Sequence, residues 1–144
     1  MRSPAELTQR FRDRNLKVTP QRQAVFRMLD NNPMHPTADV VYESVAAEMP
    51  TISLRTVYQT LNDLVDMGEI HRIELGTRSA RFDTNVEAEH HHLVCDGCGL
   101  VRDVFADTDD LVPDAGVPEG FEISGTDVVF RGRCERCAGS SNDR

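Results

Sequence analysis

The N-terminal half of the chain carries its hydrophobic residues at the spacing of amphipathic helices. Four helices are predicted, over residues 4–15, 20–31, 38–49 and 54–67. Thr19, Thr37 and Ser53 stand directly before the last three as N-caps, because their side-chain oxygens can accept a free backbone N–H. Gly68 suits the end of the fourth helix. The residues expected to face the core are Leu7, Phe11, Val25, Phe26, Met28, Leu29, Val40, Val41, Val45, Ala46, Val57, Leu61, Leu64 and Val65.

The hydrophobic period changes after the fourth helix. Residues 72–75 alternate polar and apolar side chains as a strand does, residues 76–79 suit a turn, and residues 80–83 suit the returning strand. Helices followed by a β-hairpin are typical of a winged helix-turn-helix. The pattern therefore predicts a winged-helix DNA-binding domain over residues 1–84, followed by a short polar hinge over residues 85–89.

Strands dominate the prediction for the second half. They are expected over residues 90–95, 100–105 and 128–133, with residues 121–124 as a candidate fourth. Acidic residues within 107–115 suit the start of a short helix, although Pro113 opposes it. These elements predict a small C-terminal α/β domain over residues 90–138, with a disordered tail over 139–144. The fold class predicted for the whole chain is α+β.

Charge is distributed unevenly between the two halves. The net charge of −8 argues against a nucleic-acid partner, but residues 1–27 carry seven Arg or Lys against two acidic residues. Residues 86–144 carry thirteen acidic residues against five Arg. A basic N-terminal face is what DNA binding requires, but on charge alone a solvated helix face is the better interpretation. The N-terminus lacks the apolar region of a secretory signal, and no apolar run is long enough for a membrane span, so we expect a cytoplasmic protein.

All four cysteines fall in two pairs of the form CxxC. Cys95 pairs with Cys98, and Cys134 pairs with Cys137. Two such pairs complete a tetrahedral shell of four sulfurs, which suits structural Zn²⁺ and leaves no open coordination position. A thioredoxin-like redox motif is the alternative, but it requires a CxxC that opens a helix after a strand. The double motif therefore predicts one structural zinc ion, which would compensate for a small core.

Histidines and carboxylates form a second group of metal-ligand candidates. His90 and His92 alternate with His91 along a predicted strand, so their side chains point to one face. His35, Asp83 and Asp103 would each be ordinary surface or loop residues if taken alone. Together with the two strand histidines, they would make a site of three imidazoles and two carboxylates, a donor set that accommodates Fe²⁺ or Mn²⁺. Spacing alone does not show that the five side chains converge.

The chain resembles the ferric uptake regulator family over nearly its whole length. The residues that carry the resemblance are Leu16 to Arg22, His35 to Ala38, Ser53 to Tyr58, Arg81 to Asp83, His90 to Gly99, and Cys134 with Cys137. The family fold is a winged-helix domain hinged to an α/β dimerisation domain. The resemblance implies a homodimeric, metal-dependent repressor that binds palindromic double-stranded DNA.

The resemblance also assigns the regulatory ligands for Fe²⁺ or Mn²⁺. The family's inter-domain site maps onto His35, Asp83, His90, His92 and Asp103. Iron-sensing members tend to have Glu at the position of Asp83, whereas the peroxide-sensing branch tends to have Asp at both carboxylate positions, as here. No His follows His92, so the additional site of many iron and zinc regulators is incomplete. The resemblance therefore favours peroxide sensing through iron-catalysed oxidation of a histidine, with His35 and His90 as the vulnerable pair.

The fourth predicted helix is expected to read DNA. Its candidate contacts, together with a minor-groove lysine implied by the resemblance, are Lys17, Arg55, Thr56, Tyr58, Gln59 and Asn62. Such side chains can reach base edges and phosphates in the major groove. Outside a winged helix, the same residues would be an ordinary polar helix face.

Three alternative functions are set against this prediction. A regulator of the same family could sense iron or manganese without responding to peroxide. A metalloenzyme could use the histidine cluster, but a catalytic metal needs an open position and a nearby base, and no hydrolase or deaminase motif is present in the sequence. A winged-helix adaptor without sensing leaves the set of His35, Asp83, His90, His92 and Asp103 unexplained. A regulator rather than an enzyme is therefore expected.

Overall fold

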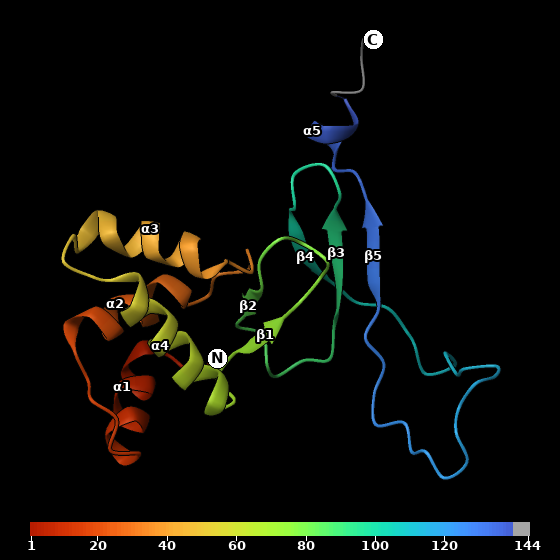
Figure 1. Ribbon diagram of the computed structural model, residues 1–144, viewed down its shortest axis with the longest axis horizontal. Coiled ribbons are helices and arrows are strands. Elements are labelled where there is room, and N and C mark those ends of the chain that lie inside the picture. Colours follow the sequence, from red (N-terminus) through yellow and green to blue (C-terminus); the bar gives the residue numbers. More distant parts are fainter. Residues whose placement is uncertain (140–144) are drawn as a thin grey trace. The chain divides into compact units, whose positions relative to one another are not determined.

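The computed structural model describes residues 1–139 of the chain (Figure 1). It divides into two compact units, Met1–Ala88 and Glu89–Arg144. Apart from Gly139, the tail predicted to be disordered lies outside the described residues. Both helices and sheets are present, as the predicted α+β class requires.

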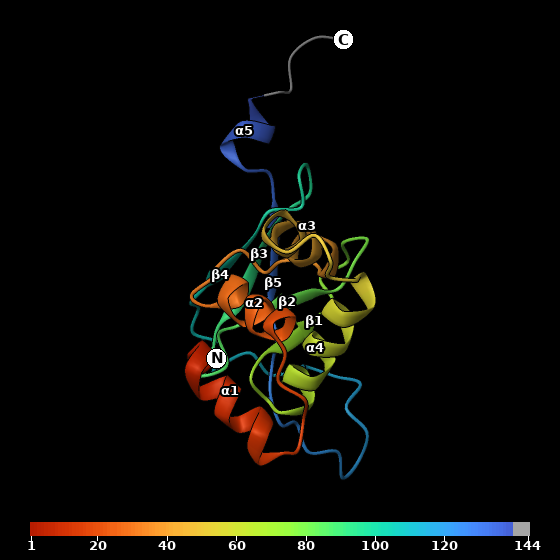
Figure 2. The ribbon, with the colours of Figure 1, turned by 90° about the vertical axis from the view of Figure 1, so that its left-hand side faces the viewer.

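Four helices build the first unit. They are α1 (Pro4–Asp13), α2 (Pro20–Leu29), α3 (Ala38–Glu48) and α4 (Leu54–Asp66). The three predicted N-caps are confirmed, because Thr19, Thr37 and Ser53 each accept a hydrogen bond from the backbone N–H three residues later. The helix α2 packs against α1, α3 and α4 and lies at the centre of the group (Figure 2).

The core of the first unit lies between these helices. Val25, Val41, Val57 and Leu61 are completely buried, as their spacing predicts. The prediction for Val40 is wrong, since 48% of this residue is exposed. Val41 and Val45 fill the core-facing side of α3. Successive residues of an α-helix are rotated by about 100°, so Val40 points away from that side.

Ion pairs connect the helices at the edge of this core. Arg22 of α2 contacts Asp63 of α4 at 2.8 Å, and its guanidinium also lies 5.3 Å from the ring of Phe11 on α1. Glu69, which is only 1% exposed, lies in the turn after α4 and forms an ion pair with Arg10, with Oε1 and Nε 2.7 Å apart. A buried carboxylate needs such partners, because burying it without them is costly. These contacts fix α1 and α2 against α4.

A short hairpin follows the helices. It consists of β1 (His71–Ile73) and β2 (Arg81–Asp83), which pair antiparallel with Arg72 opposite Phe82. The backbone N–H of Phe82 also donates to the carbonyl of Pro36 at 3.0 Å, so the hairpin is attached to the segment before α3. Helices and hairpin together form the predicted winged helix-turn-helix.

The second unit is built on a three-stranded sheet. Its central strand β3 (His91–Cys95) pairs antiparallel with β4 (Val101–Val104) and parallel with β5 (Val129–Gly132). A four-residue helix, α5 (Glu135–Ala138), follows β5 and was not predicted. In the described chain between β4 and β5 there is neither the helix expected at 107–115 nor the strand expected at 121–124. Gly116 and Gly120 adopt positive φ there, and with Pro113 they interrupt regular structure.

Within the described residues, none of the helices has both the length and the apolar character needed to cross a bilayer.

Candidate metal centres and DNA-binding surface

Four cysteine side chains converge in the second unit. Cys95 ends β3, Cys98 lies in the turn before β4, and Cys134 and Cys137 flank the start of α5. Their sulfur atoms all lie within 4.8 Å of one another, and all four cysteines are free thiols. Local backbone bonds shape each turn: the N–H of Gly99 donates to the carbonyl of Cys95 at 2.8 Å, and that of Cys137 to Cys134 at 2.9 Å. The sequence prediction that both pairs meet is thus matched by the geometry.

Gly97 leaves room for this cluster. A Cβ atom placed on Gly97 would lie 2.7 Å from Cβ and 2.8 Å from Sγ of Cys137. Real Cβ atoms do not approach other atoms so closely, so any side chain at this position would displace Cys137. The first turn is therefore shaped to admit the sulfur of the second pair.

The electrostatics of the cluster fit a bound cation. The backbone N–H of Cys134, which lies 3.2 Å from the sulfur of Cys95, lowers the pKa of that thiol to about 6. By contrast, hydrogen bonds between the thiol of Cys137 and the sulfurs of Cys134 and Cys98 favour its protonated form and raise the pKa of Cys137 to about 12. Four adjacent thiolates repel each other without a positive ion between them. The donor set suits Zn²⁺, which would allow all four to ionise.

Arg136 is a further member of this site that sequence reasoning missed. It lies between Cys134 and Cys137, and its hydrogen bond with Cys98 raises the pKa of its guanidinium. A cation beside the sulfurs offsets part of their negative charge. The signal in the sequence was its position inside the second CxxC pair.

The first unit supplies one histidine–carboxylate pair. Nε2 of His35 lies 3.5 Å from Oδ1 of Asp83, and both side chains are 2% exposed. Nδ1 of His35 lies 3.1 Å from the carbonyl of Pro33. When Nδ1 carries the proton and donates it to this carbonyl, Nε2 keeps its lone pair, which points toward the carboxylate of Asp83. Histidines that bind metals have the same arrangement.

The backbone around His35 is built to hold this position. His35 has a φ of +48°, a left-handed conformation that side chains adopt only at a cost of about 1–3 kcal/mol. Arg81 on β2 donates to the carbonyl of His35 at 3.1 Å, and burial lowers the pKa of that guanidinium. The N–H of Asn85 donates to Oδ1 of Asp83 at 2.8 Å. Both members of the pair are therefore fixed by neighbours on and beside one strand.

The second unit supplies two histidines and a carboxylate. Nε2 of His90 lies 3.6 Å from Oδ1 of Asp103, and the rings of His90 and His92 are 4.9 Å apart. His92 and Asp103 are directly opposite in the register of β3 and β4, which places them on the same face. One ligand atom from each of these three residues lies within 4.8 Å of the others. The predicted alternation along β3 agrees with this contact.

The two remaining strand histidines are His91 and His71. The N–H of Val128 donates to Nδ1 of His91 at 3.4 Å, and the hydroxyl of Thr108 lies 3.4 Å from Nε2. His91 thus attaches the segment between β4 and β5 to the sheet, on the face opposite to His92. His71, at the start of β1, is exposed.

The residues predicted to contact DNA are accessible. Arg55, Tyr58, Gln59 and Asn62 recur at helical spacing on α4 and are exposed, while Thr56 is half-buried beside its cap Ser53. The opposite side of α4 carries the buried Val57, Leu61 and Leu64. Lys17 is exposed in the segment between α1 and α2.

A profile of the ferric uptake regulator family matches residues 13–130. The chain belongs to the ferric uptake regulator family. This membership confirms the expectation of a regulator rather than an enzyme.

Named relatives and solved structures support the assignment. The peroxide-responsive repressor PerR of Staphylococcus epidermidis is 32% identical over 92% of this chain and 88% of its own length. The peroxide operon regulator of Bacillus subtilis is 30% identical over 95% and 94%. The ferric uptake regulator of Helicobacter pylori, described with three functional metal-binding sites, superposes with a TM-score of 0.77 at 22% identity, covering 96% of this chain and 93% of the other.

Similar solved structures also contain the expected metals. The ferric uptake regulator of Pseudomonas aeruginosa with manganese has a TM-score of 0.63 at 27% identity, covering 88% of this chain and 96% of the other. Further matches are a zinc-bound manganese uptake regulator and a ferric uptake regulator with iron. Zinc, iron and manganese are the metals that the sequence predicts for this regulator.

We predict that Gly97→Ala weakens zinc binding by about tenfold or more, the range seen when a neighbour that orients a metal ligand is lost. The added methyl group would displace Cys137. Zinc retention during titration with a chromogenic chelator would measure the effect. Gly132→Ala is the matched control, because nothing lies within 4 Å of its added Cβ. Equal zinc retention in both variants would contradict the proposed packing of Gly97 against the cluster.

Proposed function

We propose that this chain is a metal-dependent, DNA-binding repressor that senses peroxide. The observation that carries the proposal is the histidine–carboxylate contact found in each unit, His35 with Asp83 and His90 with Asp103. Both groups combine imidazole and carboxylate donors without a thiol. This donor chemistry suits Fe²⁺ or Mn²⁺, while the four cysteines suit zinc.

We assign the histidine and carboxylate donors of both units to a single regulatory ion. His35 and Asp83 would bind it from the DNA-binding unit, and His90, His92 and Asp103 from the sheet, as family membership suggests. Neither group alone supplies five donors. If the two units share one ion, the orientation of the winged-helix unit would depend on the bound metal. DNA affinity would then follow metal occupancy.

The response to peroxide is assigned to the imidazoles. Fe²⁺ held by these residues would supply an electron to hydrogen peroxide, and the imidazoles that hold it would be the groups within reach of the resulting oxidant. Carboxylates resist oxidation, and the thiols are expected to be held by zinc. His35 and His90 are the proposed targets. Loss of His35 as a ligand removes the donor that the DNA-binding unit provides beside Asp83, and DNA is released.

A homodimer is proposed as the DNA-binding form. The segment between β4 and β5 exposes large apolar side chains, of which Leu111, Val112, Val117, Phe121 and Ile123 line one open pocket. A contiguous apolar surface of this kind marks an interaction site. Two-fold symmetry would present two recognition helices to a palindromic operator. A cytoplasmic location, where thiols remain reduced, accompanies this proposal.

Substitutions in α4 test the proposed DNA contact. Arg55→Ala should weaken binding to the operator and to unrelated DNA alike, because it removes a charge that can contact phosphate. Tyr58→Ala should weaken operator binding roughly tenfold with little change on unrelated DNA, because it removes a base contact. Fluorescence anisotropy with both DNA sequences measures each affinity. Wild-type affinity in both variants would show that α4 does not read DNA.

Peptide mass spectrometry tests the sensing mechanism. After low peroxide, iron-loaded protein should gain one oxygen atom, about 16 Da by analogy with single-oxygen steps of side-chain oxidation, on His35 or His90. Manganese-loaded protein is the control and should bind DNA without this gain. Release of DNA with oxidised cysteines and intact histidines would overturn the mechanism. No response to peroxide would instead identify an iron- or manganese-sensing regulator.

A further inference from the structure

His35 occupies a backbone conformation that the local sequence opposes. Its φ of +48° lies in the left-handed region, which side chains other than glycine rarely adopt. Pro36 adds a second conflict, because a proline favours an extended conformation for the residue before it. Such a conformation persists only where the surrounding structure holds it. The neighbours of His35 must therefore supply contacts that keep its backbone in place.

Three consecutive residues of β2 supply these contacts. Nη1 of Arg81 donates to the carbonyl of His35 at 3.1 Å, and the backbone N–H of Phe82 donates to the carbonyl of Pro36 at 3.0 Å. The carboxylate of Asp83 lies 3.5 Å from Nε2 of His35. One short strand thus contacts both the backbone and the imidazole of a residue that lies 46 positions before Arg81 in the chain.

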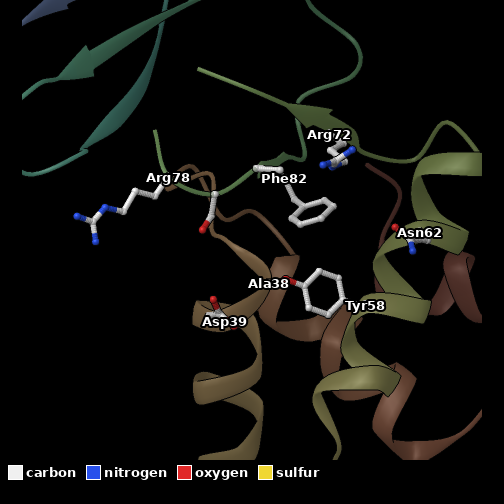
Figure 3. A pocket seen from close by; sticks show the side chains of 9 residues that line it. Ala38, Asp39, Tyr58, Asn62, Arg72, Arg78 and Phe82 are labelled. Atoms are coloured by element: carbon white, nitrogen blue, oxygen red, sulfur yellow. The ribbon is translucent and has the colours of Figure 1, made fainter. Parts of the chain in front are cut away.

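Alternation along the strand explains how these contacts are placed. Residues two apart point to the same side of a strand, so Arg81 and Asp83 lie on one side of β2. Phe82 points to the other side, toward Tyr58 of α4 (Figure 3), and belongs to the apolar core of the first unit. Because the ring of Phe82 is anchored in that core, Arg81 and Asp83 reach His35 from a strand that is fixed against the helices.

We propose that Arg81 is a positioning residue of the regulatory metal site, which holds the left-handed backbone of His35 so that Nε2 points to the position of the metal. The inference rests on the proposed function. Arg81 contacts the carbonyl of His35, and it would act on the metal through that residue alone. A guanidinium suits this role because it stays charged when half-buried, and a charged donor makes a stronger hydrogen bond than a neutral one.

The charge of Arg81 acts in the opposite direction from this positioning role. A guanidinium beside a metal ligand repels a divalent cation, so removal of the charge alone would strengthen metal binding. Removal of the hydrogen bond would instead release the backbone of His35 and weaken metal binding. The loss of a residue that orients a metal ligand lowers metal affinity by about ten- to hundredfold. The direction of the change in affinity therefore separates the two effects.

Manganese binding to the zinc-loaded protein tests the proposal. Arg81→Met keeps a long stem but removes the donors, and it should weaken Mn²⁺ binding by about tenfold or more in a titration followed by electron paramagnetic resonance. Arg81→Lys retains a charged donor and should recover much of the affinity. Arg72→Met is the matched control on the same hairpin, because the side chain of Arg72 is 54% exposed and pairs with the exposed Glu74. Its Mn²⁺ affinity should equal that of the wild type.

The NMR signals of the imidazole report the position of His35 without a metal. The contact of Nδ1 with the carbonyl of Pro33 at 3.1 Å favours the tautomer with the proton on Nδ1, which long-range ¹H–¹⁵N spectra identify at about pH 8, where imidazoles are neutral. Arg81→Met should populate both tautomers, whereas Arg81→Lys should keep the wild-type pattern. Arg81→Gln, with a neutral amide on a shorter stem, gives the same comparison if Arg81→Met does not fold.

The outcomes separate this proposal from its foundation. Unchanged or tighter Mn²⁺ binding in Arg81→Met overturns the positioning role and leaves the regulatory site intact. Weaker binding with the wild-type tautomer of His35, and without recovery in Arg81→Lys, also contradicts the positioning role, because the imidazole has then not moved. Wild-type protein that binds no Mn²⁺ beside its zinc overturns both the proposed regulatory site and the role of Arg81.

Discussion

Four sulfur atoms hold together a unit that has little apolar core of its own. Among the described residues of the second unit, only Val94, Cys95 and Val101 are buried apolar side chains. The cysteine cluster joins the end of β3 to α5, which lies beyond β5. A zinc ion at this point closes a loop of about forty residues, and metal binding then becomes part of the folding free energy. The sheet that carries His92 and Asp103 would then depend on this closure.

The first unit is stabilised in the opposite way. Its core is a continuous apolar cluster contributed by all four helices and by Phe82 of the hairpin. Ion pairs such as Arg22 with Asp63 lie at the edge of that cluster and set the position of α4 rather than replace the core. This arrangement leaves the exposed face of α4 free for binding. The chain therefore combines a unit with a continuous apolar core and a unit whose few buried apolar side chains are accompanied by a four-cysteine cluster.

The sequence was most informative where a local rule decides the structure. Caps such as Thr19 and the pairing of Cys95 with Cys98 depend on neighbouring residues, and both were predicted. Local rules failed where distant contacts decide. The exposure of Val40 depends on which side of α3 the rest of the core occupies, and α5 is too short to show a helical period. For the same reason, spacing could not show that His35 and Asp83 meet, because they come from separate segments of the chain.

The three residues of β2 connect the two proposed activities of the first unit. Arg81 donates to the carbonyl of His35, the buried Phe82 belongs to the apolar core that includes α4, and Asp83 faces the imidazole of His35. Adjacent residues of a strand cannot move independently, because they share one backbone and one hydrogen-bonded partner strand. His35 is also held in a costly left-handed conformation by these neighbours. A change at the proposed ligand His35, whether metal loss or oxidation, would therefore act on the same short strand whose Phe82 belongs to the core that includes α4, and this would connect the proposed sensing chemistry to the hairpin.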